Sequence, residues 1–178
     1  APFVAARPAS GFLLEARTRG MRCLPLRLVC GLEWIATLRL RAFLVRENID
    51  GICVKNYKHA RLAALARCGL PANILCRRGN NGDIRNTLRH RLTITRCADG
   101  VLVPSAALKL EFCRVAWLDP ARVFVLRHEI DAHGMASVHP AEGLPDASCR
   151  VLFVGRLCPT KGTDILLQAW RIAQSRAP

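Results

Sequence analysis

The chain has 178 residues, of which 51% are hydrophobic, and this content argues against a wholly disordered protein. Its 27 Lys and Arg residues outnumber 13 Asp and Glu residues, and the net charge of +14 favours anionic partners such as nucleotide diphosphates, nucleic acid or an acidic membrane surface. No apolar stretch approaches the roughly 20 residues needed to cross a bilayer, so any membrane contact is expected to be peripheral.

The cysteines and histidines indicate neither a disulfide framework nor a metal site. The nine cysteines include no C-x-x-C pair, and several lie inside apolar runs, as Cys53 and Cys76 do. We therefore expect free, buried thiols in a reducing cytoplasm. None of the five histidines has a second histidine four residues away, so no metal site is expected.

Hydrophobic periodicity and turn residues predict alternating helices and strands. Helices are expected at residues 10–19, 32–45, 60–68, 83–98 and 106–116. Short apolar strands are expected at residues 51–54, 73–76, 101–105 and 120–126. Ser10 and Ser105 stand at helix N-cap positions, and Ser105 lacks the G-x-S-x-G surroundings of a nucleophile.

This alternation predicts the fold class and the domains. Strands that alternate with helices indicate an α/β protein with a doubly wound, Rossmann-like parallel sheet and right-handed crossovers. Residues 1–126 are expected to form this domain. Residues 127–149 hold Gly, Pro and His without a clear period and are expected to link it to a second domain, which begins within residues 150–178.

The second domain is expected to begin with a strand, a basic turn and a helix. Residues 151–155 are a short run closed by Gly155 that is typical of a strand buried on both faces. A polar turn follows, and then apolar residues at helical spacing, with Thr163 or Asp164 as the helix start. The turn places Arg156 and Lys161 beside the free N–H groups of a helix N-terminus, and this chemistry suits a diphosphate.

This stretch resembles the start of the C-terminal domain of the family 4 glycosyltransferases, the "glycosyl transferases group 1" domain. The motif stands here as Val154-Gly155-Arg156-Leu157, then Lys161-Gly162, then an apolar helix. The resemblance implies that Arg156 and Lys161, with Gly155 in the same motif, bind the diphosphate of a nucleotide-sugar donor. It also implies the GT-B architecture, in which an acceptor-side Rossmann-like domain faces a donor-binding one.

Residues 97–131 resemble the same family in a second block. Ala98-Asp99, an apolar strand that ends at Ser105, and a Pro-x-x-Val strand at residues 120–123 follow the family's order. The last element departs from it, because His128 and Glu129 stand where the family has Asn and Gly. The loss of this glycine is expected to change the backbone turn at the interdomain hinge, and with it the activity.

The resemblance implies a retaining glycosyltransferase that moves a sugar from a nucleotide sugar to a cell-surface glycan or lipopolysaccharide-type acceptor. No metal or other cofactor is expected, because basic side chains and helix dipoles stabilise the leaving diphosphate. The expected location is the cytoplasm, at the inner face of the membrane, and no catalytic residue is assigned. The family's first strand and its Glu-x7-Glu motif are expected beyond the two ends, so the chain is expected to be a fragment that is inactive alone.

Three basic residues are candidates for the acceptor side. Lys55, Arg77 and Arg78 follow or end predicted strands, and ligands of open α/β sheets bind at the carboxyl ends of strands. They are therefore candidates to face an anionic acceptor. The simpler interpretation, which the basic composition favours, is that all three are solvated surface side chains.

Other hypotheses remain open. One is that the chain is an inactive, truncated remnant of such an enzyme, as the departure at His128 and Glu129 indicates. Another is a basic nucleic-acid-binding α/β module, although the even spread of charge and the lack of an RNP-like or zinc-finger pattern argue against nucleic acid as a partner. A nucleotide-dependent dehydrogenase is less favoured, because no G-x-G-x-x-G follows any strand.

Overall fold

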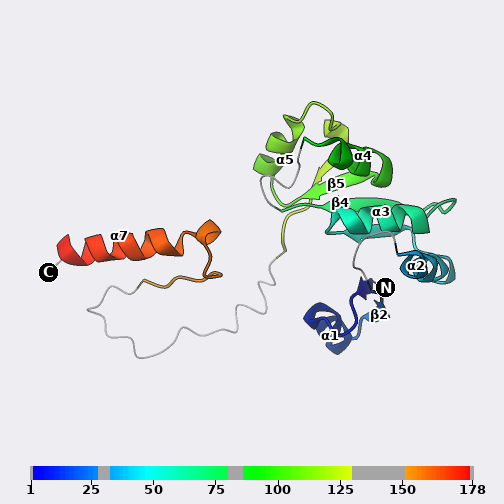
Figure 1. Cartoon of the computed structure of the whole chain (residues 1–178), viewed down its shortest axis with the longest axis horizontal. Helices are drawn as coiled ribbons and strands as arrows, with labels where there is room; N and C mark the ends of the chain where they lie inside the picture. The colour runs from blue at the N-terminus through cyan, green and yellow to red at the C-terminus, as the bar shows by residue number, and fades with distance from the viewer. Residues whose placement is uncertain (1, 28–32, 80–85, 130–150, 177–178) are drawn as a thin grey trace. The chain divides into compact units, whose positions relative to one another are not determined.

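The computed structural model describes residues 2–27, 33–79, 86–129 and 151–176 of the chain (Figure 1). It divides the protein into two compact units, Ala1–Ile130 and Asp131–Pro178, and each is described by itself. The expected linker at residues 127–149 lies for the most part outside the described residues.

Strands and helices alternate through unit 1, as the sequence predicts, but the strand at Phe3–Ala6 was not expected. The strands are β1 (Phe3–Ala6), β2 (Arg22–Pro25), β3 (Gly51–Val54), β4 (Asn73–Arg77), β5 (Gly100–Val103) and β6 (Val123–Val125). The helices are α1 (Gly11–Thr18), α2 (Trp34–Arg46), α3 (Tyr57–Ala66), α4 (Leu88–Cys97), α5 (Ala106–Cys113) and the 3-10 turn η1 (Pro120–Arg122).

All strand pairs in unit 1 that the structure describes are parallel. One sheet has the order β3-β4-β5-β6, and β1 pairs with β2 in a second sheet. The register aligns Ile52 with Ile74, Cys76 with Val101, and Val101 with Val123. Parallel strands in open sheets confirm an α/β, Rossmann-like class. The reversal of strand order that makes a sheet doubly wound is not observed among the described strands.

Side-chain caps set the beginnings of three helices. The Ser10 hydroxyl accepts a hydrogen bond from the Leu13 N–H at the start of α1, and Ser105 does the same for Leu108 at the start of α5. Both caps were expected from the sequence. Residues 83–85 of the helix expected at residues 83–98 lie outside the described residues; α4 begins at Leu88, and the Thr87 hydroxyl accepts a hydrogen bond from the His90 N–H at its start.

Small and branched side chains fill two core clusters in unit 1. In the first, α2 and α3 pack on β3 and β4, and Ala60, Ala63 and Ala66 of α3 are buried there. Alanines let the helix axis approach the sheet closely. The second cluster joins α4, β5, α5 and β6 around Ile94, Val101 and Val123. The strand ends at the edge of the sheet are thereby held at fixed positions.

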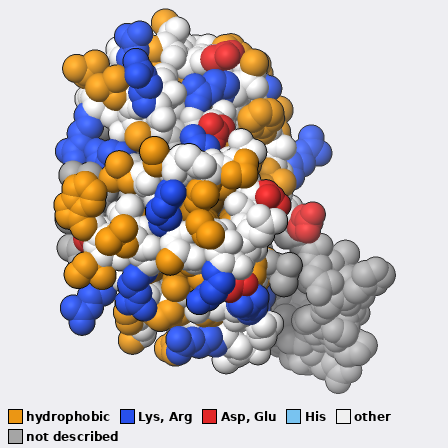
Figure 2. All heavy atoms as spheres, turned by 90° about the vertical axis from the view of Figure 1, so that its right-hand side faces the viewer, with side chains coloured by type: hydrophobic (Ala, Val, Ile, Leu, Met, Phe, Trp, Pro, Cys, Tyr) orange, Lys and Arg blue, Asp and Glu red, His pale blue; other side chains and the backbone are white. Residues whose placement is uncertain are grey.

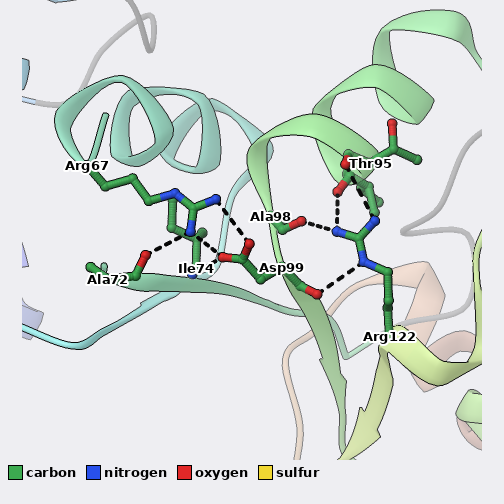
Figure 3. A network of polar contacts seen from close by, with 8 residues as sticks. Arg67, Ala72, Ile74, Thr95, Ala98, Asp99 and Arg122 are labelled. Atoms are coloured by element: carbon green, nitrogen blue, oxygen red, sulfur yellow. Dashed lines mark hydrogen bonds and ion pairs between the residues drawn. The ribbon is translucent and has the colours of Figure 1, made fainter. Parts of the chain in front are cut away.

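A carboxylate between α4 and β5 ties three elements together (Figure 3). Asp99 accepts hydrogen bonds from both terminal nitrogens of Arg67, which follows α3, and from the Ile74 N–H of β4 at 2.6 Å. Arg67 also donates to the Ala72 carbonyl at 2.7 Å. The contact therefore locks the end of α3 to the start of β4 and of β5.

Arg122, from the turn before β6, closes the end of α4 (Figure 3). Its Nε donates to the Asp99 carbonyl at 3.1 Å, and its Nη1 and Nη2 donate to the carbonyls of Thr95, Ile94 and Ala98. The last carbonyls of a helix have no partner within the helix, and here one guanidinium supplies the missing donors.

Unit 2 contains the expected helix but not the expected strand. Its described elements are the 3-10 turn η2 (Pro159–Lys161) and helix α7 (Thr163–Arg176). Residues 151–155 form no strand, and Leu152 and Val154 are 86% and 85% exposed, so the prediction of a buried strand there is wrong for this structure. A strand buried on both faces needs neighbouring strands, and residues 151–176 contain none.

We expect Asp99→Asn to lower the free energy of unfolding, because Arg67 loses its charged partner. The loss should be only about 1 kcal/mol, because the Asp99 side chain is partly exposed, at 39%. Burial alone raises the pKa of Asp99, but hydrogen bonds from Arg67 and Ile74 outweigh it and hold the pKa below its ordinary value of 3.8. A lowered folded pKa gives stability that is present above the unfolded pKa and lost as the pH falls through the folded one.

Urea titrations of the parent protein and of Asp99→Asn, at neutral pH and below pH 3.8, measure the difference between their free energies of unfolding, which should become smaller at the lower pH. Asp50→Asn is the matched control, because Asp50 is exposed and its carboxylate has no hydrogen bond to a described residue. Equal stability of the Asp99→Asn and Asp50→Asn variants at neutral pH would contradict the assigned role.

Candidate functional site

The carboxyl edge of the β3–β6 sheet gathers the basic residues that the sequence analysis singled out. Lys55 follows β3, Arg77 ends β4, and Arg78 comes directly after it. The Arg78 Nη1 donates to the Lys55 carbonyl oxygen at 3.0 Å, so the ends of β3 and β4 are joined there. In open parallel sheets this edge is where ligands bind.

Arg78 is not a solvated surface side chain, contrary to the simpler interpretation of the sequence. It is 6% exposed and its backbone N–H donates to the Leu102 carbonyl at 2.8 Å, which extends the β4–β5 pairing by one residue. Strand alternation places Arg78 on the same face as Ile74 and Cys76. Its guanidinium is therefore held in the interior, on the side of the sheet that α3 covers.

The side chains of Arg77 and Arg78 lie on opposite faces of the sheet and have different partners. Arg77 is exposed and its Nη2 lies 2.7 Å from the Nδ1 of His128, which follows β6. Because a guanidinium has only donors, the imidazole nitrogen accepts in this contact. The structure thus gives His128 a partner across β5. Consecutive strand residues point to opposite faces, which separates the two arginines.

An aromatic ring that was not predicted from the sequence lies against Arg78. The Arg78 Cζ lies 3.3 Å from the ring centroid of Tyr57, in the first turn of α3. The Tyr57 and His90 rings are 3.8 Å apart at an angle of 65°. Apart from Tyr57 being the single tyrosine of the chain, nothing in the sequence indicated this contact, because Tyr57 and Arg78 are far apart in the sequence.

The basic turn of unit 2 contains the residues expected to bind the donor diphosphate. Gly155, Arg156 and Lys161 are all exposed, and Lys161 ends η2. Gly162 follows with φ +67°, a left-handed conformation that suits glycine, and its carbonyl accepts the Leu166 N–H at 2.9 Å in the first turn of α7. Among the described residues, neither Arg156 nor Lys161 contacts a carboxylate.

The pKa of the Cys158 thiol in this turn depends on the hydrogen bond and the charges around it. The Cys158 Sγ lies 3.2 Å from the Thr160 hydroxyl. That hydrogen bond lowers the pKa of Cys158 below its ordinary value of 9.0; desolvation opposes it, and the charges of Arg156 and Lys161 assist it. Asp164 adds one negative charge in the first turn of α7, yet the turn still stabilises an anion at Cys158.

A groove of about 480 Å³ lies along α3 and α4. Its lining, which the sequence analysis did not anticipate, comprises Arg61, Arg89, Leu92, Thr93, Arg96 and Cys97. Burial raises the pKa of Cys97, so its thiol stays protonated at neutral pH and is not a nucleophile.

Basic side chains are dispersed over the face seen in Figure 2, among apolar ones and with few acidic ones. They do not gather there into one continuous basic stripe. No set of three His, Cys, Asp or Glu side chains among the described residues is arranged to hold a metal ion. None of the described helices combines the length and the apolar character required to span a membrane.

No protein-family model matches the chain, and the curated proteins contain no match to it.

We expect Thr160→Val to raise the pKa of Cys158, because it removes the hydroxyl that hydrogen-bonds the thiolate. The measurement is the pH dependence of Cys158 alkylation, followed by mass spectrometry of the peptide that contains it. Thr163→Val makes the same chemical change at a hydroxyl with no hydrogen-bond partner, and should leave the profile unchanged. Superimposable profiles for Thr160→Val and the parent protein would exclude the hydroxyl as the cause.

Proposed function

We propose that the protein is a retaining glycosyltransferase of the GT-B type that transfers a sugar from a nucleotide-sugar donor to a cell-surface glycan or lipopolysaccharide-type acceptor. Arg156 and Lys161 bind the donor diphosphate in unit 2. The acceptor binds at the carboxyl edge of the sheet in unit 1. The expected place of action is the cytoplasmic face of the membrane, where the basic surface meets acidic lipid head groups.

The observation that carries the proposal is the turn before α7. Two exposed cations without carboxylate partners among the described residues stand in the turn that leads into a helix N-terminus. The lowered pKa of Cys158, caused first by Thr160 and then by Arg156 and Lys161, indicates that the turn favours negative charge. A diphosphate requires this combination of basic side chains and free N–H groups.

The chemistry assigned to this turn is stabilisation of a leaving group. When the bond between the sugar and the diphosphate breaks, negative charge develops on the diphosphate oxygens. Arg156 and Lys161 hold that charge through charge-assisted hydrogen bonds, and the positive end of the α7 dipole adds to them. Basic side chains in this role make a metal ion unnecessary for departure of the nucleotide.

A nucleic-acid-binding module is the second candidate, and the net charge of +14 is the observation that favours it. The dispersed basic side chains of Figure 2 favour it less than a single basic stripe would. An inactive remnant of a transferase is the third. It predicts that the protein transfers no sugar from any nucleotide-sugar donor.

We expect Arg156→Ala and Lys161→Ala each to weaken nucleoside diphosphate binding about tenfold, since each removes one charge-assisted contact. Isothermal titration with UDP, GDP and ADP measures the affinity. Arg171→Ala is the matched control, because it removes the same charge from an exposed position later in α7. An equal loss for all three variants would indicate a general charge effect and would contradict the assigned site.

The nucleic-acid alternative is tested in the same samples. Under the proposal, a short DNA duplex does not displace the bound nucleoside diphosphate at physiological salt. A DNA complex that nucleotide sugars cannot displace, and that weakens steeply with salt, would favour the nucleic-acid-binding module instead.

A further inference from the structure

Arg78 is a buried cation that no carboxylate neutralises in the part of unit 1 that the structure describes. It is 6% exposed, and the ion pairs among the described residues join Arg19 to Glu15, Arg22 and Arg46 to Glu47, and Arg67 to Asp99. A guanidinium keeps its proton in proteins, so this charge remains inside the fold. Burying an ion is unfavourable unless other groups compensate for its lost hydration.

The contacts of Arg78 satisfy only part of its guanidinium. One face lies on the Tyr57 ring at 3.3 Å, and Nη1 donates to the Lys55 carbonyl. The Nε and Nη2 atoms are buried and have no hydrogen-bond partner. Unpaired buried donors are rare in folded proteins and call for an explanation.

The two unpaired nitrogens lie along the same edge of the guanidinium plane. Their N–H bonds point in nearly the same direction, at a spacing that matches two oxygens of one phosphate or carboxylate group. The buried edge that has no hydrogen-bond partner in Arg78 is therefore the edge with which an arginine binds an oxyanion in bidentate fashion.

Two other arginines of unit 1 show what a purely structural guanidinium looks like in this fold. Arg122 directs Nε, Nη1 and Nη2 to backbone carbonyls, and Arg67 directs both terminal nitrogens to Asp99 (Figure 3). Both lie near the starts of β4 and β5, whereas Arg78 lies where β4 ends. Of these three arginines, Arg78 alone has two buried donors without a hydrogen-bond partner.

We propose that the Nε–Nη2 edge of Arg78 binds the phosphate group of a small phosphorylated molecule at the carboxyl edge of the sheet in unit 1. Phosphate is favoured over carboxylate because a phosphate dianion combines paired oxygens with a larger negative charge, and the buried guanidinium has no carboxylate partner among the described residues. The assignment is independent of the donor turn in unit 2. If the proposed transferase function holds, the small molecule takes the place of a phosphate group carried by the glycan or lipopolysaccharide-type acceptor.

The test is an isothermal titration of inorganic phosphate, a hexose phosphate and acetate into the full chain carrying Arg156→Ala and Lys161→Ala, which removes the turn of unit 2 as a second anion site. We expect both phosphates to bind more tightly than acetate. Arg78→Lys should weaken phosphate binding at least about tenfold, because lysine keeps the charge but lacks the two parallel N–H groups. Arg17→Lys, at an exposed position in α1, should change it less than about threefold.

A second measurement does not depend on a variant at a buried position. The Nε–H signal of Arg78 in heteronuclear NMR spectra of the same background should shift as phosphate is added, and should not shift with chloride at equal ionic strength. Binding of inorganic phosphate but not of the hexose phosphate would support the site and identify free phosphate as its ligand.

Three results would overturn the proposal: phosphate affinity that Arg78→Lys leaves unchanged, an Arg78 signal that does not move at saturating phosphate, or acetate that binds as tightly as phosphate. Nucleoside diphosphate binding through Arg156 and Lys161 is measured separately in the unmodified chain. Failure of that site leaves the Arg78 result standing, and failure at Arg78 leaves the donor site standing.

Discussion

The Asp99 carboxylate is the contact on which the arrangement of unit 1 depends. It receives the guanidinium of Arg67 and the Ile74 N–H, while its own backbone carbonyl receives Arg122. Helix α3, strands β4 and β5, and the turn before β6 are thereby joined around one residue (Figure 3). Because the strands are parallel and short, their ends at the opposite edge are placed by the same constraint.

The two ends of the strands use arginine in different ways. Near the starts of β4 and β5, Arg67 and Arg122 are saturated with backbone and carboxylate acceptors, so they contribute to stability. At the carboxyl edge, Arg78 is buried against Tyr57 with two donors unpaired. Near the strand starts the arginine donors have acceptors within the fold, whereas at the carboxyl edge two donors of Arg78 have none. This difference is why we place the binding site at the carboxyl edge.

Several features of the fold could be predicted because they depend on neighbouring residues. The Ser10 and Ser105 caps each involve an N–H three residues away, and the alternation of strands and helices follows from local apolar periodicity. The strand expected at residues 151–155 was wrong because an apolar run becomes a strand only when another strand pairs with it, and unit 2 has none among its described residues.

The candidate site was predictable in part. The sequence placed Lys55, Arg77 and Arg78 at strand ends, but it did not distinguish the buried arginine from the exposed one. That distinction comes from the pleat of β4 and from Tyr57, which approaches from another element. In unit 2, Arg156 and Lys161 could be singled out directly, because a basic turn before a helix is a local pattern.

The sequence by itself determined that this is an α/β protein with parallel strands, basic residues at strand ends and a basic turn before its last helix. Local spacing and capping carry this information, so no tertiary contact was needed to read it. Only the tertiary structure decided which arginine is buried, which carboxylate holds the strands and which donors remain free. These features join residues distant in the chain, as Arg67 and Asp99 are, 32 residues apart, and no local pattern encodes such a pairing.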